Sequence, residues 1–150
     1  GNEHSKALMS DGTIVLSIRQ EGVAKDLRAT STDGINLTYV GENDNWVANN
    51  CGRSMVRAGD STTNGPEKLL WSGCIDTTIS SHADHVIRVS FDGLQTWQHQ
   101  FRLVDTKTRG GYSNIISLGD GFYFVILESG FNDYCTMGCH VFNMSWGYSQ

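Results

Sequence analysis

Two residues that could take part in chemistry lie at one end of a predicted hairpin, in the stretch RGGYSNIISLGDGFYFVILESG at residues 109–130. Tyr112 stands where the first strand begins, between glycines and a serine, and the second strand ends on Glu128. A phenol with a pKa of about 10 is a poor nucleophile at neutral pH, so tyrosine chemistry would require a base beside it. Tyrosine is common in sheets, so a structural tyrosine at the rim is the alternative.

The composition limits the classes of partner. The chain has 150 residues, which suit one unit over residues 1–150 with a core of its own. Its net charge of −5 and pI near 5.4 argue against a nucleic acid or an anionic membrane, since both require a basic face. No run approaches the roughly 18 apolar residues of a membrane span. No signal-peptide pattern opens the chain, so we expect a targeting segment to be absent or already removed.

Cysteines and glycosylation acceptors together favour a secreted or extracellular protein with an oxidising history. The four cysteines allow three full pairings, and the simplest joins Cys51 to Cys74 and Cys135 to Cys139. The two acceptor asparagines are Asn36, before Leu37-Thr38, and Asn143, before Met144-Ser145. Zinc binding by Cys135, Cys139 and His140 is an alternative, but no second ligand cluster has a recognised spacing. We therefore expect no metal and no cofactor.

Strand alternation broken by Asp-Gly turns recurs along the chain, and helical periodicity is nearly absent. The turns begin at Asp11, Asp33, Asp92 and Asp120. Asp-Gly between apolar runs is a strong hairpin signal, because glycine accepts a positive φ at little cost. The run FYFVILE is apolar on both faces, which indicates a strand buried between sheets. NNCGRSMVR and KLLWSG predict further short strands. The chain is therefore expected to be all-β, with many short antiparallel strands and no domain boundary.

Two of these turns share a longer pattern, SFDGLQTW at 90–97 and STDGINLTY at 31–39. The aspartate of each can accept backbone N–H bonds within its own turn, and the terminal aromatic is expected to pack beneath it. The pattern resembles the Asp-box, Ser-x-Asp-x-Gly-x-Thr-Trp, of sialidase-type β-propellers. Both copies differ from it in having the glycine one position early, with Leu94 or Ile35 in its usual place. We expect Asp33 and Asp92 to be structural.

The resemblance to the sialidase superfamily extends over essentially the whole chain. NEHSKALMSDGTIVLSIRQEG looks like the segment in which Asn-Glu precedes a hairpin and an arginine, and LRATSTDG resembles the next blade. GYSNIISLGDGFYFVILESG is similar to the segment that carries the nucleophile, and HVFNMSW looks like the closing strand. The resemblance implies a six-bladed β-propeller of antiparallel sheets, of which this chain supplies roughly the last three blades.

The resemblance also implies a role for each residue at the candidate site. Tyr112 matches the nucleophile, and Glu3 matches the carboxylate that takes its proton. Arg19 matches one of three arginines that bind the carboxylate of the substrate, and Glu128 matches an acid that orients an arginine. Sialidases use tyrosine in place of a carboxylate nucleophile. A neutral nucleophile avoids repulsion by the sialic acid carboxylate, which the planar fork of an arginine binds through both oxygens.

Two departures from the family pattern bear on activity. The family places a further arginine about eight residues before the Ser of the later turn, where this chain has His82 or Ala83. Arg88 stands only two residues before Ser90, too close to the turn to replace it. The first half of the propeller would supply another arginine and the general acid. Because an open half-propeller exposes strand edges and apolar faces, we expect a second chain to complete the ring, either the N-terminal half of a cleaved precursor or a further copy.

The sequence thus supports three hypotheses. The first is a sialidase, or a transferase with the same chemistry, that acts on terminal sialic acids of glycoconjugates. The second is a sialic-acid-binding lectin that has lost catalysis, suggested by the missing arginine near His82. The third is a structural propeller module that recognises a protein.

Overall fold

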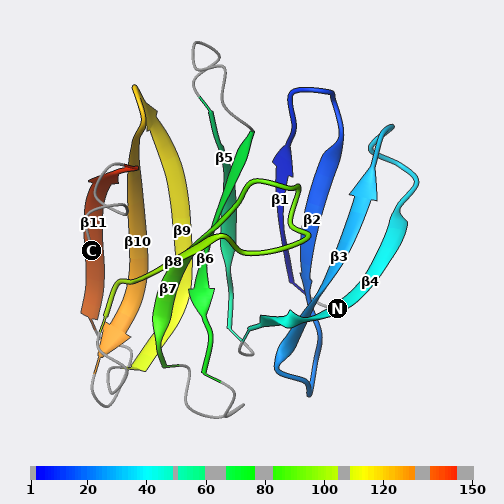
Figure 1. The fold of residues 1–150 in the computed structure, drawn as a ribbon. Helices are drawn as coiled ribbons and strands as arrows, with labels where there is room; N and C mark the ends of the chain where they lie inside the picture. The colour runs from blue at the N-terminus through cyan, green and yellow to red at the C-terminus, as the bar shows by residue number, and fades with distance from the viewer. Residues whose placement is uncertain are drawn as a thin grey trace.

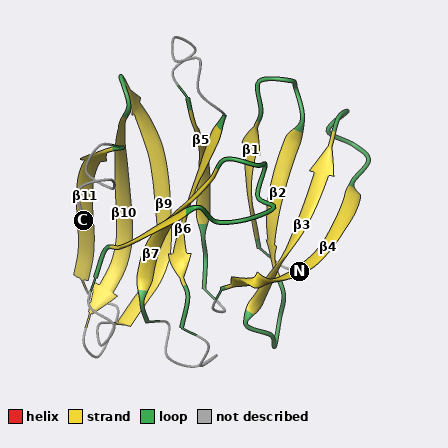
Figure 2. Cartoon of the chain, viewed as in Figure 1, coloured by secondary structure: helices red, strands yellow, loops and turns green. Residues whose placement is uncertain are grey.

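The computed structural model describes residues 3–48, 51–59, 67–76, 83–104, 109–130 and 136–144, with residues 42–47 and 109 described by their backbone only. These residues form strands and loops without a helix, as predicted (Figure 2). The strands make three antiparallel sheets that lie side by side (Figure 1). Among the described residues no helix is long and apolar enough to cross a membrane.

Each sheet is built from consecutive strands of the chain. The first sheet has the order β1 (His4–Leu8), β2 (Ile14–Arg19), β3 (Lys25–Ser31), β4 (Thr38–Val47). The second sheet has the order β5 (Ser54–Ala58), β6 (Lys68–Cys74), β7 (His85–Ser90), β8 (His99–Arg102). The third sheet has the order β11 (Thr136–Asn143), β10 (Phe122–Gly130), β9 (Arg109–Gly119). The short strands expected within NNCGRSMVR and KLLWSG are confirmed as β5 and β6.

The edge strands β1, β5 and β9 bring the three sheets together, because β5 contacts both β1 and β9. Apolar side chains fill the two spaces between neighbouring sheets. Between the first and second sheets, Val15 packs with Met55 and Leu69. Between the second and third, Ile87 packs with Val125 in a larger cluster. The expectation that the strand FYFVILE is buried on both faces is met only in part, since Tyr123, Val125 and Leu127 are buried but Phe122 is exposed.

Asp-Gly turns close the β1–β2 and β9–β10 hairpins, as predicted. Gly12 has φ +85°, and Asp120 and Gly121 have φ +51° and +75°, the left-handed pair that a tight hairpin turn requires. Since β1 begins where β2 ends, and β9 begins where β10 ends, these turns lie at one end of the strands. The opposite end carries the beginning of β1 and β9 and the end of β2 and β10.

The two longer turns confirm that Asp33 and Asp92 have structural roles. Asp33 Oδ1 accepts the backbone N–H groups of Ile35 and Asn36 at 2.9 and 2.8 Å. Asp92 Oδ1 accepts those of Gln95 and Thr96 at 2.9 and 3.0 Å. Both turns follow strands that start at the same end as β1, so they lie at the far end from Glu3 and Tyr112.

The aromatic residue that ends each turn pattern behaves differently in the two copies. Trp97 packs against the cores between the first and second sheets, as expected. Tyr39 is 56% exposed, so the expectation that it packs beneath its turn is wrong. The reason is its place on β4, the edge strand of the first sheet, whereas the Trp97 loop crosses over toward β1 and β2 (Figure 1).

Candidate active site

Tyr112 reaches from the third sheet to the first. It lies near the start of β9 and its side chain is 52% exposed, yet its phenol donates a 2.5 Å hydrogen bond to Glu3 Oε1. The two residues are 109 positions apart in the chain. Because β5 separates β9 from β1, the ring must pass over the segment that leads into β5.

Gly52 makes this passage possible. A Cβ atom at Gly52 would lie 1.9 Å from Cδ1 and 2.4 Å from Cε1 of Tyr112, far inside any real contact distance. The ring therefore occupies the space that a side chain at position 52 would fill. Residues 49–57 were predicted to contain a short strand, and this role of Gly52 was not predicted. In the sequence, the only sign of this role is the glycine itself, between Cys51 and Arg53.

Glu3 and Arg19 come together through the β1–β2 hairpin. The backbone N–H of Arg19 donates to the Glu3 carbonyl at 2.9 Å, which fixes the two residues opposite each other. Arg19 Nη1 then donates to Glu3 Oε2 at 2.6 Å, with the two side chains 12% and 30% exposed. One carboxylate thus joins the phenol through one oxygen and the guanidinium through the other. The structure brings together the three residues that were predicted to meet.

The pKa values of Glu3 and Tyr112 are shifted in opposite directions. Partial burial acts to raise the pKa of Glu3, but the net shift is downward. The hydrogen bonds from Tyr112 and Arg19 lower this pKa, and the positive charges of Arg19 and Arg53 lower it further. The hydrogen bond to Glu3 and desolvation raise the pKa of Tyr112, against the influence of Arg19. At neutral pH the resting site therefore holds a neutral phenol bonded to a carboxylate.

Glu128 lies behind the tyrosine at the end of β10. Its Oε2 accepts the backbone N–H of Tyr112 at 3.1 Å. Gly111 allows this approach, because a Cβ there would lie 2.2 Å from Glu128 Oε2. Glu128 was predicted to orient an arginine, whereas the contact found within the described ranges is to the backbone of Tyr112. The register of β9 and β10 shifts between Leu127 and Ser129, next to this contact.

A buried ion pair adjoins the site and was missed by the sequence analysis. Arg53 Nη1 bonds to Asp26 Oδ1, and both side chains are 2% exposed. Asp26 lies on β3 directly opposite Arg19 of β2. Burial raises the pKa of Asp26 to about 6, although the charge of Arg53 and the hydrogen bond from Ser17 act to lower it. No local sequence pattern marks this pair, because Asp26 lies on β3 and Arg53 lies 27 residues later in the segment before β5.

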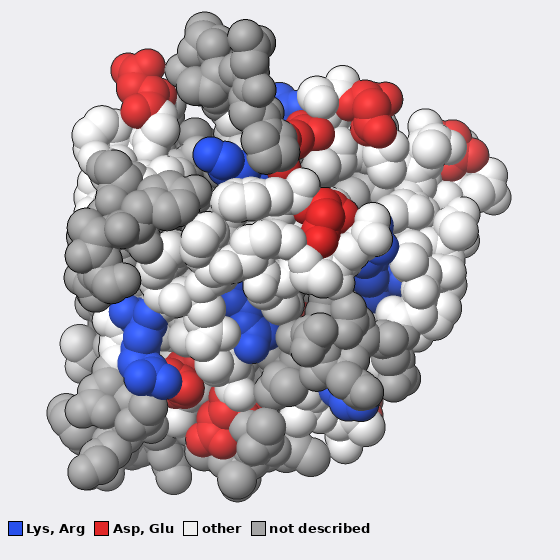
Figure 3. Space-filling view, viewed as in Figure 1, with Lys and Arg blue, Asp and Glu red and all other residues white. Residues whose placement is uncertain are grey.

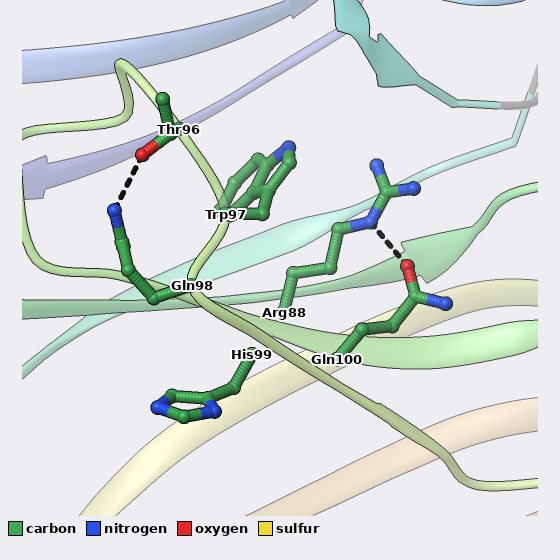
Figure 4. Close-up of a pocket in the computed structure, with 6 residues that line it drawn as sticks. All are labelled: Arg88, Thr96, Trp97, Gln98, His99 and Gln100. Atoms are coloured by element: carbon green, nitrogen blue, oxygen red, sulfur yellow. Dashed lines mark hydrogen bonds between the residues drawn. The ribbon is translucent and has the colours of Figure 1, made fainter.

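The position of the expected further arginine is occupied differently. His82 lies outside the described residues, and Ala83 is buried. Arg88 lies on β7 beside a cavity of about 430 Å³, whose other lining residues are Thr96, Trp97, Gln98, His99 and Gln100 (Figure 4). Its Nε donates to Gln100 at 2.8 Å, and its guanidinium lies 5.6–5.7 Å from the rings of Trp71 and Trp97. Arg88 is thus engaged by residues between the first two sheets.

Cys51, Cys74 and Cys139 fall within the described residues, and none of the three forms a disulfide there. Cys51 and Cys74 are buried neighbours, and the hydrogen bond between their side chains raises the pKa of Cys74. Cys139 is exposed, and its predicted partner Cys135 lies outside the described ranges. Cys74 also contacts His85 Nδ1 at 3.5 Å, and burial lowers the pKa of this fully buried histidine to about 4.

The predicted glycosylation acceptors lie away from the site. Asn36 is exposed in the turn after β3, where its side-chain amide donates to Asp33 at 2.7 Å. Asn143 ends β11, and Ser145 of the same acceptor lies outside the described residues. On the face drawn in Figure 3, basic and acidic side chains are interspersed among uncharged ones.

Comparison with solved structures shows which fold this is. The chain is similar to the Hadza microbial sialidase Hz136, with 19% identity over 96% of this chain and 28% of that one, and a TM-score of 0.80. It is also similar to the intramolecular trans-sialidase of Ruminococcus gnavus in complex with oseltamivir carboxylate, with 17% identity, coverage of 98% and 33%, and a TM-score of 0.77. The leech intramolecular trans-sialidase matches with 15% identity, coverage of 96% and 24%, and a TM-score of 0.77.

No family model matches the sequence, and no curated protein matches it either. The likeness to the solved structures therefore shows the fold. The chain spans only about a quarter to a third of the length of the three proteins described above. Its three antiparallel sheets match blades of the sialidase propeller, as the sequence analysis predicted. The chain has the fold of a part of a sialidase-type β-propeller.

Proposed function

We propose that the protein is a sialidase-type glycoside hydrolase or transferase that acts on terminal sialic acids through Tyr112. One observation carries the proposal: Tyr112 and Arg19 bond to the two oxygens of Glu3 at 2.5 and 2.6 Å. A nucleophile bonded to its base, with a guanidinium beside both, is the arrangement that attack on an anionic sugar requires. The fold shared with sialidases and trans-sialidases supports the same chemistry.

The chemistry would proceed by two displacements. In the first, the Tyr112 oxygen bonds to the anomeric carbon while its proton passes to Glu3, and the bond to the aglycone oxygen breaks. The aglycone oxygen takes a proton from an acid that we assign to the rest of the ring. In the second, the same acid, now deprotonated, removes a proton from water or an acceptor hydroxyl, whose oxygen bonds to the anomeric carbon. The bond to Tyr112 breaks with net retention, and Glu3 returns its proton to the phenol oxygen. The neutral resting phenol avoids repulsion by the substrate carboxylate.

The test is the release of free sialic acid from a fluorogenic sialoside by the complete protein. The wild type is expected to turn over, and Tyr112→Phe is expected to lose activity, since phenylalanine lacks the attacking oxygen. Glu3→Gln should lose most of the rate as well. Unchanged turnover in Tyr112→Phe would reject the proposal.

A sialic-acid-binding lectin is the second candidate. It is favoured by the alanine at position 83 and by the engagement of Arg88 with Gln100, because neither supplies the further guanidinium that catalysis is expected to use. The lectin would bind sialylated glycans on an array without releasing sialic acid, and Tyr112→Phe would leave this binding unchanged. A structural module would bind no sialylated glycan at all.

We also propose that another segment or chain supplies the remaining blades. Apolar side chains on the two outer sheets are 44–62% exposed, including Tyr39 and Val40 on one side and Phe122 and Val141 on the other. Covering them would remove apolar surface from water. The N-terminal half of a cleaved precursor and a further copy are distinguished by the intact masses of the native material. A stable monomer of this chain alone would contradict the proposal.

A secretory origin is proposed together with oxidation of the buried neighbours Cys51 and Cys74. In an oxidising compartment, a thiol–disulfide oxidoreductase would accept the two electrons and two protons as the S–S bond forms. Protein prepared from the native source without reductant is expected to contain this bond and a glycan on Asn36. Peptide mass mapping that finds both thiols free and Asn36 unmodified would refute the secretory origin.

A further inference from the structure

The buried pair Asp26–Arg53 connects the first two sheets directly beneath the candidate site. Asp26 comes from β3, and Arg53 comes from the segment before β5. The second oxygen of Asp26 accepts a 2.5 Å hydrogen bond from Ser17 Oγ, which in turn accepts one from Trp71 Nε1 at 3.3 Å. The carboxylate is thus held from both sheets, and each of its oxygens has a partner.

Asp26 is also a neighbour of the site arginine. In the antiparallel pairing of β2 and β3, Asp26 is directly opposite Arg19, so the two side chains project from the same face of the sheet. The Cβ atoms of such cross-strand pairs lie about 4.5–5.5 Å apart. An unpaired carboxylate at this position would attract the Arg19 guanidinium. In the structure Asp26 bonds to Arg53, and Arg19 bonds to Glu3.

Arg53 also determines what lies beneath Tyr112. It directly follows Gly52, whose missing side chain leaves room for the tyrosine ring. An ion pair in which both side chains are 2% exposed fixes the backbone of this segment relative to β3. The same residue therefore affects the two contacts of Glu3, one through Arg19 and one through Tyr112.

We propose, resting on the proposed function, that Arg53 is a positioning residue of the site: by neutralising Asp26 it keeps Arg19 bonded to Glu3, and it holds Gly52 beneath the Tyr112 ring. Arg53 need not touch substrate, since it is buried. Its positive charge contributes to the lowered pKa of Glu3 in addition to the larger effects of Tyr112 and Arg19. Among the described residues, the charges of Arg53 before β5 and Arg88 on β7 act on Asp26, and Arg19 on β2 lies opposite it.

An ion pair that only stabilised the fold would respond differently when one or both of its members are replaced. Removing one member of a buried pair leaves an uncompensated charge, whereas replacing both by neutral groups of similar volume is often harmless to stability. The informative variants are therefore Arg53→Met alone and Arg53→Met combined with Asp26→Asn. The first leaves the Asp26 carboxylate free to attract Arg19, and the second removes both charges. In the double variant, the amide oxygen of the new asparagine would still accept the hydrogen bond from Ser17.

The experiment uses the complete protein and two readouts. The first is the titration of the Glu3 carboxyl, followed by carbon NMR with labelled glutamate and assigned by Glu3→Gln. Arg53→Met is expected to raise the Glu3 pKa, and the double variant to restore it most of the way. The second is kcat and KM for a fluorogenic sialoside. Misplacement of catalytic groups by about 1 Å costs on the order of 100-fold, so Arg53→Met should lower kcat by about that factor. The double variant should recover to within about tenfold of the wild type.

An unchanged Glu3 titration in folded Arg53→Met would overturn the proposal. So would a double variant that is folded but has the Glu3 titration and kcat of the single variant. If Arg53→Met does not fold, the double variant alone decides, because the proposal requires its Glu3 pKa to lie close to that of the wild type. Failure of the proposed function is recognised separately, as a wild type without turnover, and the titration still tests the role of Arg53 in that case.

Discussion

Replacement of Gly52 by alanine tests how the tyrosine reaches across the second sheet. The new Cβ would lie 1.9 Å from Tyr112 Cδ1, whereas ordinary contacts begin at 3.4 Å, so the ring must retreat by about 1.5 Å. Gly52 has no positive φ, so alanine fits its backbone conformation. The 2.5 Å bond between the phenol and Glu3 would then break or lengthen beyond hydrogen-bond range.

The expected cost of Gly52→Ala is about 100-fold in kcat/KM for a fluorogenic sialoside, the usual cost of moving a reacting group by about 1 Å. Stability should change by less than about 1 kcal/mol, because the Tyr112 ring is half exposed and can swing toward solvent. Gly59→Ala is the matched control, since a Cβ at Gly59 meets nothing within 4 Å. Full activity in Gly52→Ala, or an equal loss in Gly59→Ala, would refute the role of Gly52.

Three further predictions concern the surroundings of the site and the turn of the second sheet. Burial lowers the pKa of His85 from 6.5 to about 4, so its contribution to stability is complete above pH 6.5 and is lost as the pH falls toward 4. The loss amounts to about 3 kcal/mol, measured by urea unfolding at pH 7.5 and 4, and His85→Gln should flatten this difference. Leu94 has φ +67° but is fully buried. Leu94→Gly would relieve about 1–2 kcal/mol of backbone strain but would lose about 2–5 kcal/mol of packing. The variant should therefore have a lower free energy of unfolding than the wild type, and a more stable variant would contradict this. Glu128→Gln weakens a charge-assisted bond to the Tyr112 N–H, worth about 1.5–3 kcal/mol at most, so kcat should fall about tenfold; an unchanged kcat would show that the contact is dispensable.

The local elements of this fold could be predicted from the sequence because their signals are local. Asp120-Gly121 adopts the two positive φ values that its hairpin turn needs, and Asp92 accepts N–H groups within four residues of itself. The prediction that Tyr39 is buried was wrong for a different reason. Its burial depends on whether another sheet packs against β4, and a turn motif does not encode that.

The candidate site could be predicted only through the resemblance to a family. Nothing in the spacing of Glu3 and Tyr112 indicates that they meet, since their contact depends on how the third sheet packs near the first. Gly52, Asp26 and Arg53 were missed for the same reason. A glycine that leaves room for a ring and a buried ion pair are defined by neighbours from other sheets, and the sequence shows only an ordinary strand start.

The most direct test of the account is whether Tyr112 becomes covalently bonded to the sugar. A sialic acid analogue with fluorine beside the anomeric carbon and a good leaving group slows both displacements, because fluorine destabilises their positively charged transition states, and the second is slowed enough for the intermediate to accumulate. After incubation with the complete protein, intact mass spectrometry is expected to show one added sugar, and peptide mapping is expected to place it on Tyr112. An adduct on another residue, or turnover of a sialoside by a protein that never forms the Tyr112 adduct, would contradict the account.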